Sequence, residues 1–193
     1  YYSTYGHVRT LAESIKSGLE EAGCSVDVLQ VPETLSEEVL EKMHAVPKAD
    51  HPLASAESLT GYDGIIFGTG TRFGTSSAQF RALMVTTGGL WGKGALVGKP
   101  AGVFFSTGTQ GGGQETTALS MVSTFVHHGM VFVPMGYSTP LITNMDEVHG
   151  GSPWGPGTLA GPTGARQPSQ IEKDMAKHYG EHFAAIAAKL KVV

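Results

Sequence analysis

The chain has 193 residues, a net charge of −4 and a single cysteine, Cys24. That length fits one domain with a sizeable core, and one cysteine excludes both an intramolecular disulfide and a cysteine-based metal cluster. The 13 Lys and Arg residues are scattered, which argues against a nucleic-acid-binding surface. No apolar run approaches the length of a membrane span and no secretory signal pattern is present, so we expect a cytoplasmic protein.

The expected elements alternate between helices and apolar strands, which is typical of a parallel sheet covered by helices on both faces. In chain order they are a helix at residues 8–22, a strand at 25–31, a helix at 33–43, a strand at 62–68, a helix at 77–87, a strand at 101–106, a helix at 115–128, a strand at 130–134 and a helix at 171–190. Cys24 falls between the first helix and the first strand in an apolar context, where packing in the core is expected.

A long irregular segment, residues 135–168, precedes the last helix and contains Trp154 in a stretch rich in glycine and proline. Connections of this length are usually functional or held by a partner. A subunit contact or a lid therefore competes with the interpretation as a surface loop with one anchoring aromatic.

A doubly wound sheet needs a strand that feeds the loop at Ser3, yet only Tyr1 and Tyr2 precede that loop. Removing a central strand would leave backbone donors and acceptors unpaired on both of its neighbours. We therefore expect that Tyr1 and Tyr2 form the end of this strand and that a few natural residues precede them.

The first eight residues, YYSTYGHV, place hydroxyl groups and a glycine just before the first helix. A helix N-terminus offers unpaired backbone N–H groups and a positive dipole end, so it holds a phosphate without any basic side chain. Ser3, Thr4 and Tyr5 would add O–H donors to the same anion. An ordinary capped helix explains these residues too, and later motifs decide between the two interpretations.

Glycine is frequent, 27 of 193 residues, and its clusters follow or separate apolar segments. The loop after the strand at residues 101–106 reads STGTQGGG and offers hydroxyls and free N–H groups at a strand's carboxyl end, where open α/β sheets bind ligands. The TRFG stretch ends the preceding strand at the same edge. There Arg72 suits an anion, an interface or a solvated surface, and Phe73 suits a planar ring or a loop anchor.

Trp91 lies among glycines in GGLWGKGAL, where aromatic packing and stacking on a flat ligand both remain open. His127 and His128 close a helix, where a favourable interaction with the helix dipole explains them. Adjacent helical positions lie about 100° apart, so this pair does not readily chelate one metal. No metal site is expected, and the dinucleotide, P-loop and nucleophile-elbow motifs are absent from the sequence.

The motifs STYGHV, GTGTRFG, GGLWGKGAL, STGTQGGGQETT, HHGMVFVP, HGGSPWG and RQPSQ follow one another in the order, and at nearly the spacing, of the WrbA-type NAD(P)H:quinone oxidoreductases. The sequence resembles this family over essentially its whole length. The resemblance implies one flavodoxin-like domain over residues 1–193, an α/β fold with a doubly wound parallel five-stranded sheet in the order 2-1-3-4-5 and helices on both faces. It also implies FMN at the switch point between strands 1 and 3.

The resemblance assigns the cofactor contacts to three loops and one histidine. The implied FMN contacts are Ser3, Thr4, Tyr5, Gly6, His7, Val8, Thr71, Arg72, Phe73, Ser106, Thr107, Gly108, Thr109, Gln110, Gly111 and His127. Tyr5 and Trp91 match the positions credited with nicotinamide and substrate contact. The flavin carries the chemistry, so no catalytic side chain is implied.

The chain departs from the family pattern at a few positions. Gly70 stands where relatives often have proline, Thr75 where asparagine is usual, and Val85-Thr86 in place of an acidic and polar pair, while Gln110 reads as a one-residue insertion. Thr75 bears on the fine tuning of the flavin site.

The implied activity is the two-electron reduction of a quinone to a hydroquinone by NADH or NADPH, with ping-pong hydride transfer through FMN. The implied assembly is a homotetramer, a dimer of dimers, in which neighbouring subunits help to line each FMN site. Two other functions stay open. A one-electron flavodoxin-type carrier is disfavoured by the GGLWGKGAL insertion, and an FMN-binding regulatory protein acting on DNA is disfavoured by the scattered charge.

Overall fold

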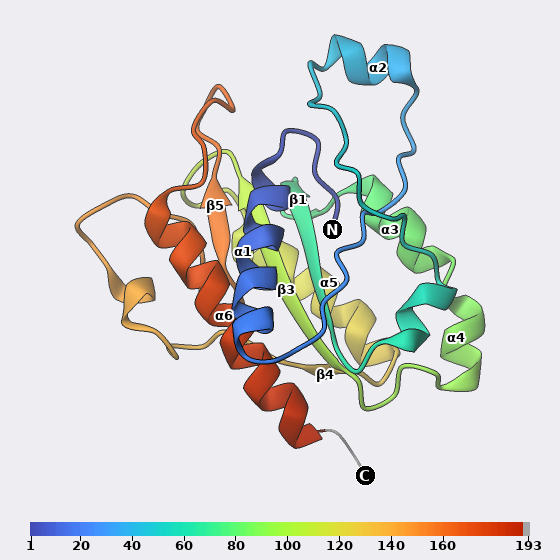
Figure 1. Ribbon diagram of the computed structural model, residues 1–193. Coiled ribbons are helices and arrows are strands. Elements are labelled where there is room, and N and C mark those ends of the chain that lie inside the picture. The colour runs from blue at the N-terminus through green and yellow to red at the C-terminus, as the bar shows by residue number, and fades with distance from the viewer. Residues whose placement is uncertain (191–193) are drawn as a thin grey trace.

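A parallel sheet forms the centre of the computed structural model, which describes residues 1–190 (Figure 1). β1 (Ile65–Arg72) and β3 (Pro100–Thr107) pair along most of their length, and β4 (Val131–Phe132) and β5 (Gly157–Leu159) both pair with β3. All these pairs are parallel. The short β2 (Thr75–Ser76) folds back antiparallel onto the end of β1.

Helices cover both faces of the sheet, as expected. One face carries α1 (His7–Glu21) and α6 (Gln170–Leu190), and the other carries α3 (Ala78–Val85), α4 (Gly88–Lys93) and α5 (Gln114–His127) (Figure 1). Each layer encloses its own apolar cluster, one around Leu11 and Tyr179 and the other around Phe80 and Phe125. Within residues 1–190, no helix combines the length and the apolar character that crossing a membrane would take.

Tyr1 and Tyr2 lie where the first strand is expected. The Tyr1 N–H donates to Leu29 O at 2.8 Å, Val31 N–H donates to Tyr1 O at 2.7 Å, and Tyr2 N–H donates to Gly68 O at 2.9 Å. These bonds place Tyr1 and Tyr2 between residues 29–31 and β1, so the expected order 2-1-3-4-5 is matched in outline. The strand expected at residues 25–31 makes such bonds only in its last three residues, beside Tyr1.

The fifth position of the sheet is shared by two short strands. β4 pairs with β3 at Pro100 and Ala101, and β5 pairs with it from Phe105 to Thr107. The strand expected at residues 130–134 is therefore shorter than predicted. The segment 135–168, expected to be irregular, contains β5 and a 3₁₀ turn, η2 (Pro140–Thr143).

A buried hydroxyl closes the gap between the two half-strands. Tyr179 Oη on α6 accepts from Val103 N–H at 3.3 Å and donates to Val133 O at 2.6 Å, and its side chain is fully buried. Burial raises the pKa of Tyr179, so the hydroxyl stays protonated and remains a donor. One side chain thus satisfies two backbone groups that a continuous strand would have paired.

Three further expectations are corrected. The helix expected at residues 33–43 is the shorter α2 (Glu37–Lys42), which stands away from the body with none of its residues buried (Figure 1). α4 and the 3₁₀ turn η1 (Glu57–Gly61) were not predicted, because three of the six residues of α4 are glycine. Cys24 is exposed rather than in the core, since it lies in the turn after α1, where Gly23 takes a φ of 86°.

α1 and α6 approach so closely that glycine is required at their crossing. A Cβ on Gly18 would collide with the backbone carbonyl of Lys177, and a Cβ on Gly180 with that of Ile15. We expect Gly18→Ala to lower the free energy of unfolding by about 2 kcal/mol, because overpacking forces the helices apart. Urea denaturation measures the difference.

Gly92→Ala is the matched control, because a Cβ at that helical position meets open space. It should raise stability by about 0.5 kcal/mol through its higher helix propensity. A Gly18→Ala protein as stable as the wild type would show that the helices tolerate a wider separation.

Candidate functional site

The loops that follow β1 and β3 meet at the carboxyl edge of the sheet. The two strands end side by side, with Gly70 paired to Ser106. Thr71 Oγ1 lies 2.9 Å from Thr117 Oγ1 on α5. A Cβ on Gly113 would come within 2.9 Å of the Cα of Gly74, so the loop backbones are in contact. The structure therefore brings residues 71–74 and 106–113 together, as the sequence predicts.

The loop before α1 joins them at the same edge. It turns at Gly6, which takes a φ of 90° and precedes the first residue of α1. Ser3 Oγ accepts from Gly6 N–H at 3.1 Å, which leaves the serine hydroxyl proton free to donate elsewhere. The first turn of α1 holds no acidic residue, so its unpaired N–H groups favour an anion.

Not every residue of this loop presents its side chain. Thr4 is 7% exposed, and its hydroxyl donates to Tyr2 Oη at 3.4 Å, so Thr4 points inward instead of toward an anion as expected. Val8 is buried in the core and offers only its backbone. Tyr5 is 40% exposed at the mouth of the loop. His7 Nε2 lies 2.8 Å from Arg166 O, which fixes Nε2 as the nitrogen that carries hydrogen.

The ring-side loops are open to solvent. Phe73 sits at a φ of 50° with its side chain fully exposed, and Arg72 is exposed beside it. Thr107 is buried and donates its hydroxyl to Thr109 O at 3.0 Å. The remaining expected residues of the β3 loop are half-buried at Ser106 and exposed at Gly108, Thr109, Gln110 and Gly111.

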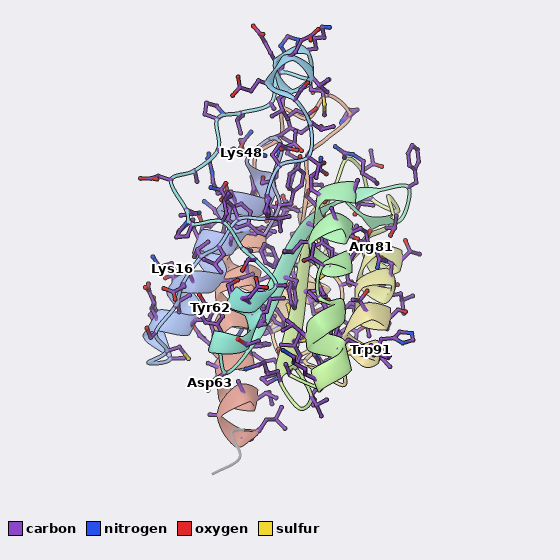
Figure 2. The ribbon with its side chains drawn as sticks, turned by 90° about the vertical axis from the view of Figure 1, so that its right-hand side faces the viewer. Lys16, Lys48, Tyr62, Asp63, Arg81 and Trp91 are labelled. Carbon is purple, nitrogen blue, oxygen red and sulfur yellow. The ribbon has the colours of Figure 1, made fainter. Side chains whose placement is uncertain are left out.

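Trp91 and His127 lie at the other end of the sheet. α5 starts at the site, where Gln114 Nε2 donates to Thr107 Oγ1 at 3.0 Å, but His127 is its last residue, about 20 Å further along the helix. Trp91 lies on α4 (Figure 2). The 2.8 Å contact between Thr87 Oγ1 and His128 Nε2 ties the start of α4 to the same far end. A single chain does not bring these two residues to the loops.

A buried carboxylate that sequence reasoning missed holds the loop after β5. Glu172 is fully buried and accepts hydrogen bonds from five residues. The donors are Gly150 N–H, Thr158 Oγ1, Leu159 N–H, Arg166 Nη1 and Ser169 N–H, at 2.7 to 3.2 Å. Burial alone would raise the pKa of Glu172, but these donors, Arg166 first, hold it below its ordinary value.

One sequence signal for this carboxylate existed. Ser169 and Glu172 have the S-x-x-E spacing of a capping box, and Glu172 N–H returns a bond to Ser169 Oγ at 3.5 Å. The same network holds Arg166, and the backbone carbonyl of Arg166 accepts a hydrogen bond from His7 Nε2. The network therefore helps to orient the first turn of α1, where His7 lies.

A second network lies on the other side of the loop before α1, residues 3–6, which we call the phosphate-type loop because its sequence predicts an anion site. The Glu33 carboxylate accepts from Tyr2 Oη at 2.9 Å, Gln79 Nε2 at 3.0 Å and Thr34 N–H at 2.9 Å, and pairs with Lys48 Nζ at 2.7 Å. Burial alone would raise the pKa of Glu33, but these hydrogen bonds, Lys48 first, lower it to about 2. No motif in the sequence marked either residue of this pair.

We expect Glu172→Gln to lower the free energy of unfolding by about 3 kcal/mol at pH 7, because Arg166 loses its buried partner and an amide cannot accept all five bonds. The folded-state pKa of Glu172 lies below its ordinary value of 4.5, so its contribution is complete above pH 4.5 and is lost as the pH falls through the lowered pKa. Urea denaturation at several pH values should therefore show the difference between wild type and variant shrinking below pH 4.5.

Glu20→Gln is the control, because Glu20 is an exposed carboxylate 3.8 Å from Lys16. It should change stability by less than about 0.5 kcal/mol. A Glu172→Gln loss that is the same at every pH would contradict the charge-based account.

Comparison with known proteins identifies the family. Residues 3–140 match the model of the family described as NADPH-dependent FMN reductase. Quinone-oxidoreductase QR2 of Triphysaria versicolor is 56% identical over 193 residues, covering 99% of this chain and 94% of that protein. NAD(P)H quinone oxidoreductase PST3 of Candida albicans is 53% identical over 190 residues, covering 97% and 96%.

Solved structures agree on the fold. A WrbA-like flavodoxin protein from Agrobacterium tumefaciens gives a TM-score of 0.70 at 23% identity, covering 99% of this chain and 96% of that one. Oxidised Flavodoxin 2 from Bacillus cereus gives 0.62 at 18% identity, covering 96% and 95%. The expected flavodoxin-like α/β fold is confirmed, and the chain belongs to the NADPH-dependent FMN reductase family.

Proposed function

We propose that this chain is an FMN-dependent NAD(P)H:quinone oxidoreductase that reduces quinones to hydroquinones by two electrons. The observation that carries the proposal is the meeting of three loops, rich in hydroxyls and glycines, at one edge of the sheet beside the first turn of α1. Relatives more than half identical over nearly their whole length are named quinone oxidoreductases, which supports this activity. The family's description supports FMN and a nicotinamide reductant.

The loop before α1 fits the phosphate of FMN. Ser3 has a hydroxyl proton free to donate, and Gly6 turns the backbone so that the first N–H groups of α1 face outward. In this proposal Ser3, Tyr5, Gly6, His7 and Val8 hold the phosphate end, chiefly through backbone groups. Thr4 contributes its backbone while its side chain braces Tyr2.

The loops after β1 and β3 fit the ring system. Thr71, Arg72, Phe73, Ser106, Thr107, Gly108, Thr109, Gln110 and Gly111 would flank it. The backbone contact between Gly74 and Gly113 keeps both loops at a fixed separation. FMN supplies the electron transfer between nicotinamide and quinone when bound, and the chain's task is to orient it and leave one face open.

Exposed Tyr5 gives that open face an aromatic wall for a nicotinamide. We propose that NAD(P)H and the quinone occupy this one face in turn. Initial-rate measurements with NAD(P)H and benzoquinone should then give parallel double-reciprocal lines. Intersecting lines with a detectable ternary complex would contradict the shared face, and negligible NAD(P)H oxidation would favour the flavodoxin-type carrier.

We also propose a homotetramer, a dimer of dimers, in which Trp91 and His127 serve the FMN site of a neighbouring subunit. Both residues are exposed and distant from their own loops. The layer formed by α3, α4 and α5 carries exposed apolar side chains, with Val85 at 81%, Trp91 at 62% and Val126 at 65% exposure. Such a surface favours burial against another subunit.

A cytoplasmic location for this single domain accords with the exposed lone cysteine.

The assembly proposal makes a separable prediction. Trp91→Ala should lower kcat/KM for benzoquinone about tenfold, because one aromatic wall of a neighbour's site is lost. Adding FMN should raise the tetramer fraction at low protein concentration, since a ligand that binds only the assembled form favours assembly. Steady-state kinetics and analytical ultracentrifugation measure the two effects.

Leu53→Ala is the control for Trp91→Ala, because Leu53 is 64% exposed beside Gln30 and lies outside α3, α4 and α5. It should leave both measurements unchanged. A monomer that binds FMN fully and turns over at the normal rate would overturn the assembly proposal.

A further inference from the structure

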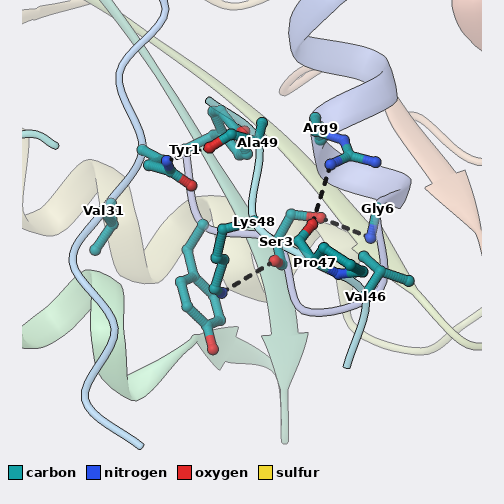
Figure 3. A pocket seen from close by; sticks show the side chains of 11 residues that line it. Tyr1, Ser3, Gly6, Arg9, Val31, Val46, Pro47, Lys48 and Ala49 are labelled. Carbon is teal, nitrogen blue, oxygen red and sulfur yellow. Dashed lines mark hydrogen bonds between the residues drawn. The ribbon is translucent and has the colours of Figure 1, made fainter. Parts of the chain in front are cut away.

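One ion pair lies against the phosphate-type loop and belongs to none of the expected cofactor contacts. Lys48 Nζ donates to Ser3 O at 3.4 Å and pairs with Glu33 at 2.7 Å. Lys48, Ser3 and Gly6 line the same small pocket, together with Arg9 (Figure 3). The ammonium group of Lys48 therefore lies between the carboxylate of Glu33 and the backbone of the loop, and it contacts both.

Both charges are held in place. Residues 46–48 are fastened to the loop by Val46 N–H, which donates to Thr4 O at 3.0 Å. Lys48 Nζ lies 4.5 Å above the ring of Tyr2, and the Tyr2 hydroxyl donates to Glu33. The Glu33 and Lys48 side chains are 18% and 33% exposed, so solvent screens the pair only in part. Each of the two charged groups therefore has further partners that hold it beside the loop.

The pair matters because a phosphate monoester carries between one and two negative charges at pH 7. A carboxylate fixed beside the loop would repel it, whereas the ion pair is neutral overall. We propose that Lys48 is a specificity-determining residue that cancels the charge of Glu33 and so preserves the preference of the loop for phosphorylated over unphosphorylated flavin. This inference rests on the proposed placement of the FMN phosphate at Ser3 and Gly6.

The test compares the affinities of the full chain, freed of flavin, for FMN and riboflavin, measured by the quenching of flavin fluorescence. The ratio of the two dissociation constants isolates the phosphate. Lys48→Met leaves a net negative charge and should lower the preference for FMN about tenfold. Glu33→Gln leaves a net positive charge and should raise it, and the double variant should return to within about threefold of the wild type.

The two single variants should change the preference for FMN in opposite directions. A merely structural role would instead weaken the binding of both flavins in both variants and leave the ratio of dissociation constants unchanged. Lys48→Arg keeps the charge and should keep the preference. Lys42→Met is the matched control, because Lys42 pairs with Glu38 at 2.6 Å on exposed α2, away from the loop. If Lys48→Met fails to fold, the Glu33→Gln result still decides the sign.

Two outcomes are distinguishable. A wild-type chain that binds riboflavin as tightly as FMN would refute the phosphate site itself. A wild type that prefers FMN, with a ratio unaltered by Lys48→Met or Glu33→Gln, would overturn the role of the pair and leave the site standing.

Discussion

The carboxyl edge of the sheet depends on the hydrogen bonds that the buried carboxylate of Glu172 accepts. An ionised carboxylate without partners costs several kcal/mol in a protein interior, so its donors must be in place together. Those donors come from segments with little regular structure, around Gly150, β5 and Arg166. The hydrogen bonds to Glu172, together with the packing of apolar residues such as Met135 and Trp154, therefore place the part of the chain between β4 and α6. The hydrogen bond from His7 Nε2 to the Arg166 carbonyl connects this network to the start of α1.

Most of the fold could be predicted from apolar periodicity, since long helices such as α5 and α6 and buried strands such as β3 carry strong patterns. β5 could not, because its three residues come after a run of glycines and prolines and are set by bonds to a distant carboxylate. α4 could not either, because its glycines disfavour a helix that is held instead by Leu90 packing on the core. Local propensity loses to tertiary context in both cases.

The candidate site shows the same division. The three loops were predictable because strand ends of a parallel sheet share one edge. The inward turn of Thr4 was not, since its direction depends on a hydrogen bond to Tyr2. The order of motifs along the chain also carries no information about distance in space. The resemblance therefore assigned Trp91 and His127 to the same site as the loops, although these two residues lie at the opposite end of the sheet. A set of residues assigned by resemblance is thus not necessarily one cluster within a single chain.

The hydroxyl of Tyr179 has a consequence for how this fold tolerates change. It bridges Val103 and Val133 where the fifth strand is interrupted, so the sheet edge does not rely on the residues immediately after Val133. Between the two half-strands the chain leaves the sheet after Val133 and returns at β5, while buried Met135 and the bond from Gly150 N–H to Glu172 still hold this segment to the body. Tyr137 and Met145 lie on this segment with exposed side chains, so substitutions at these two positions would alter the outer surface without removing a bond of the sheet. A single phenol thus lets the chain leave the sheet and return to it without leaving the backbone groups of Val103 and Val133 unpaired.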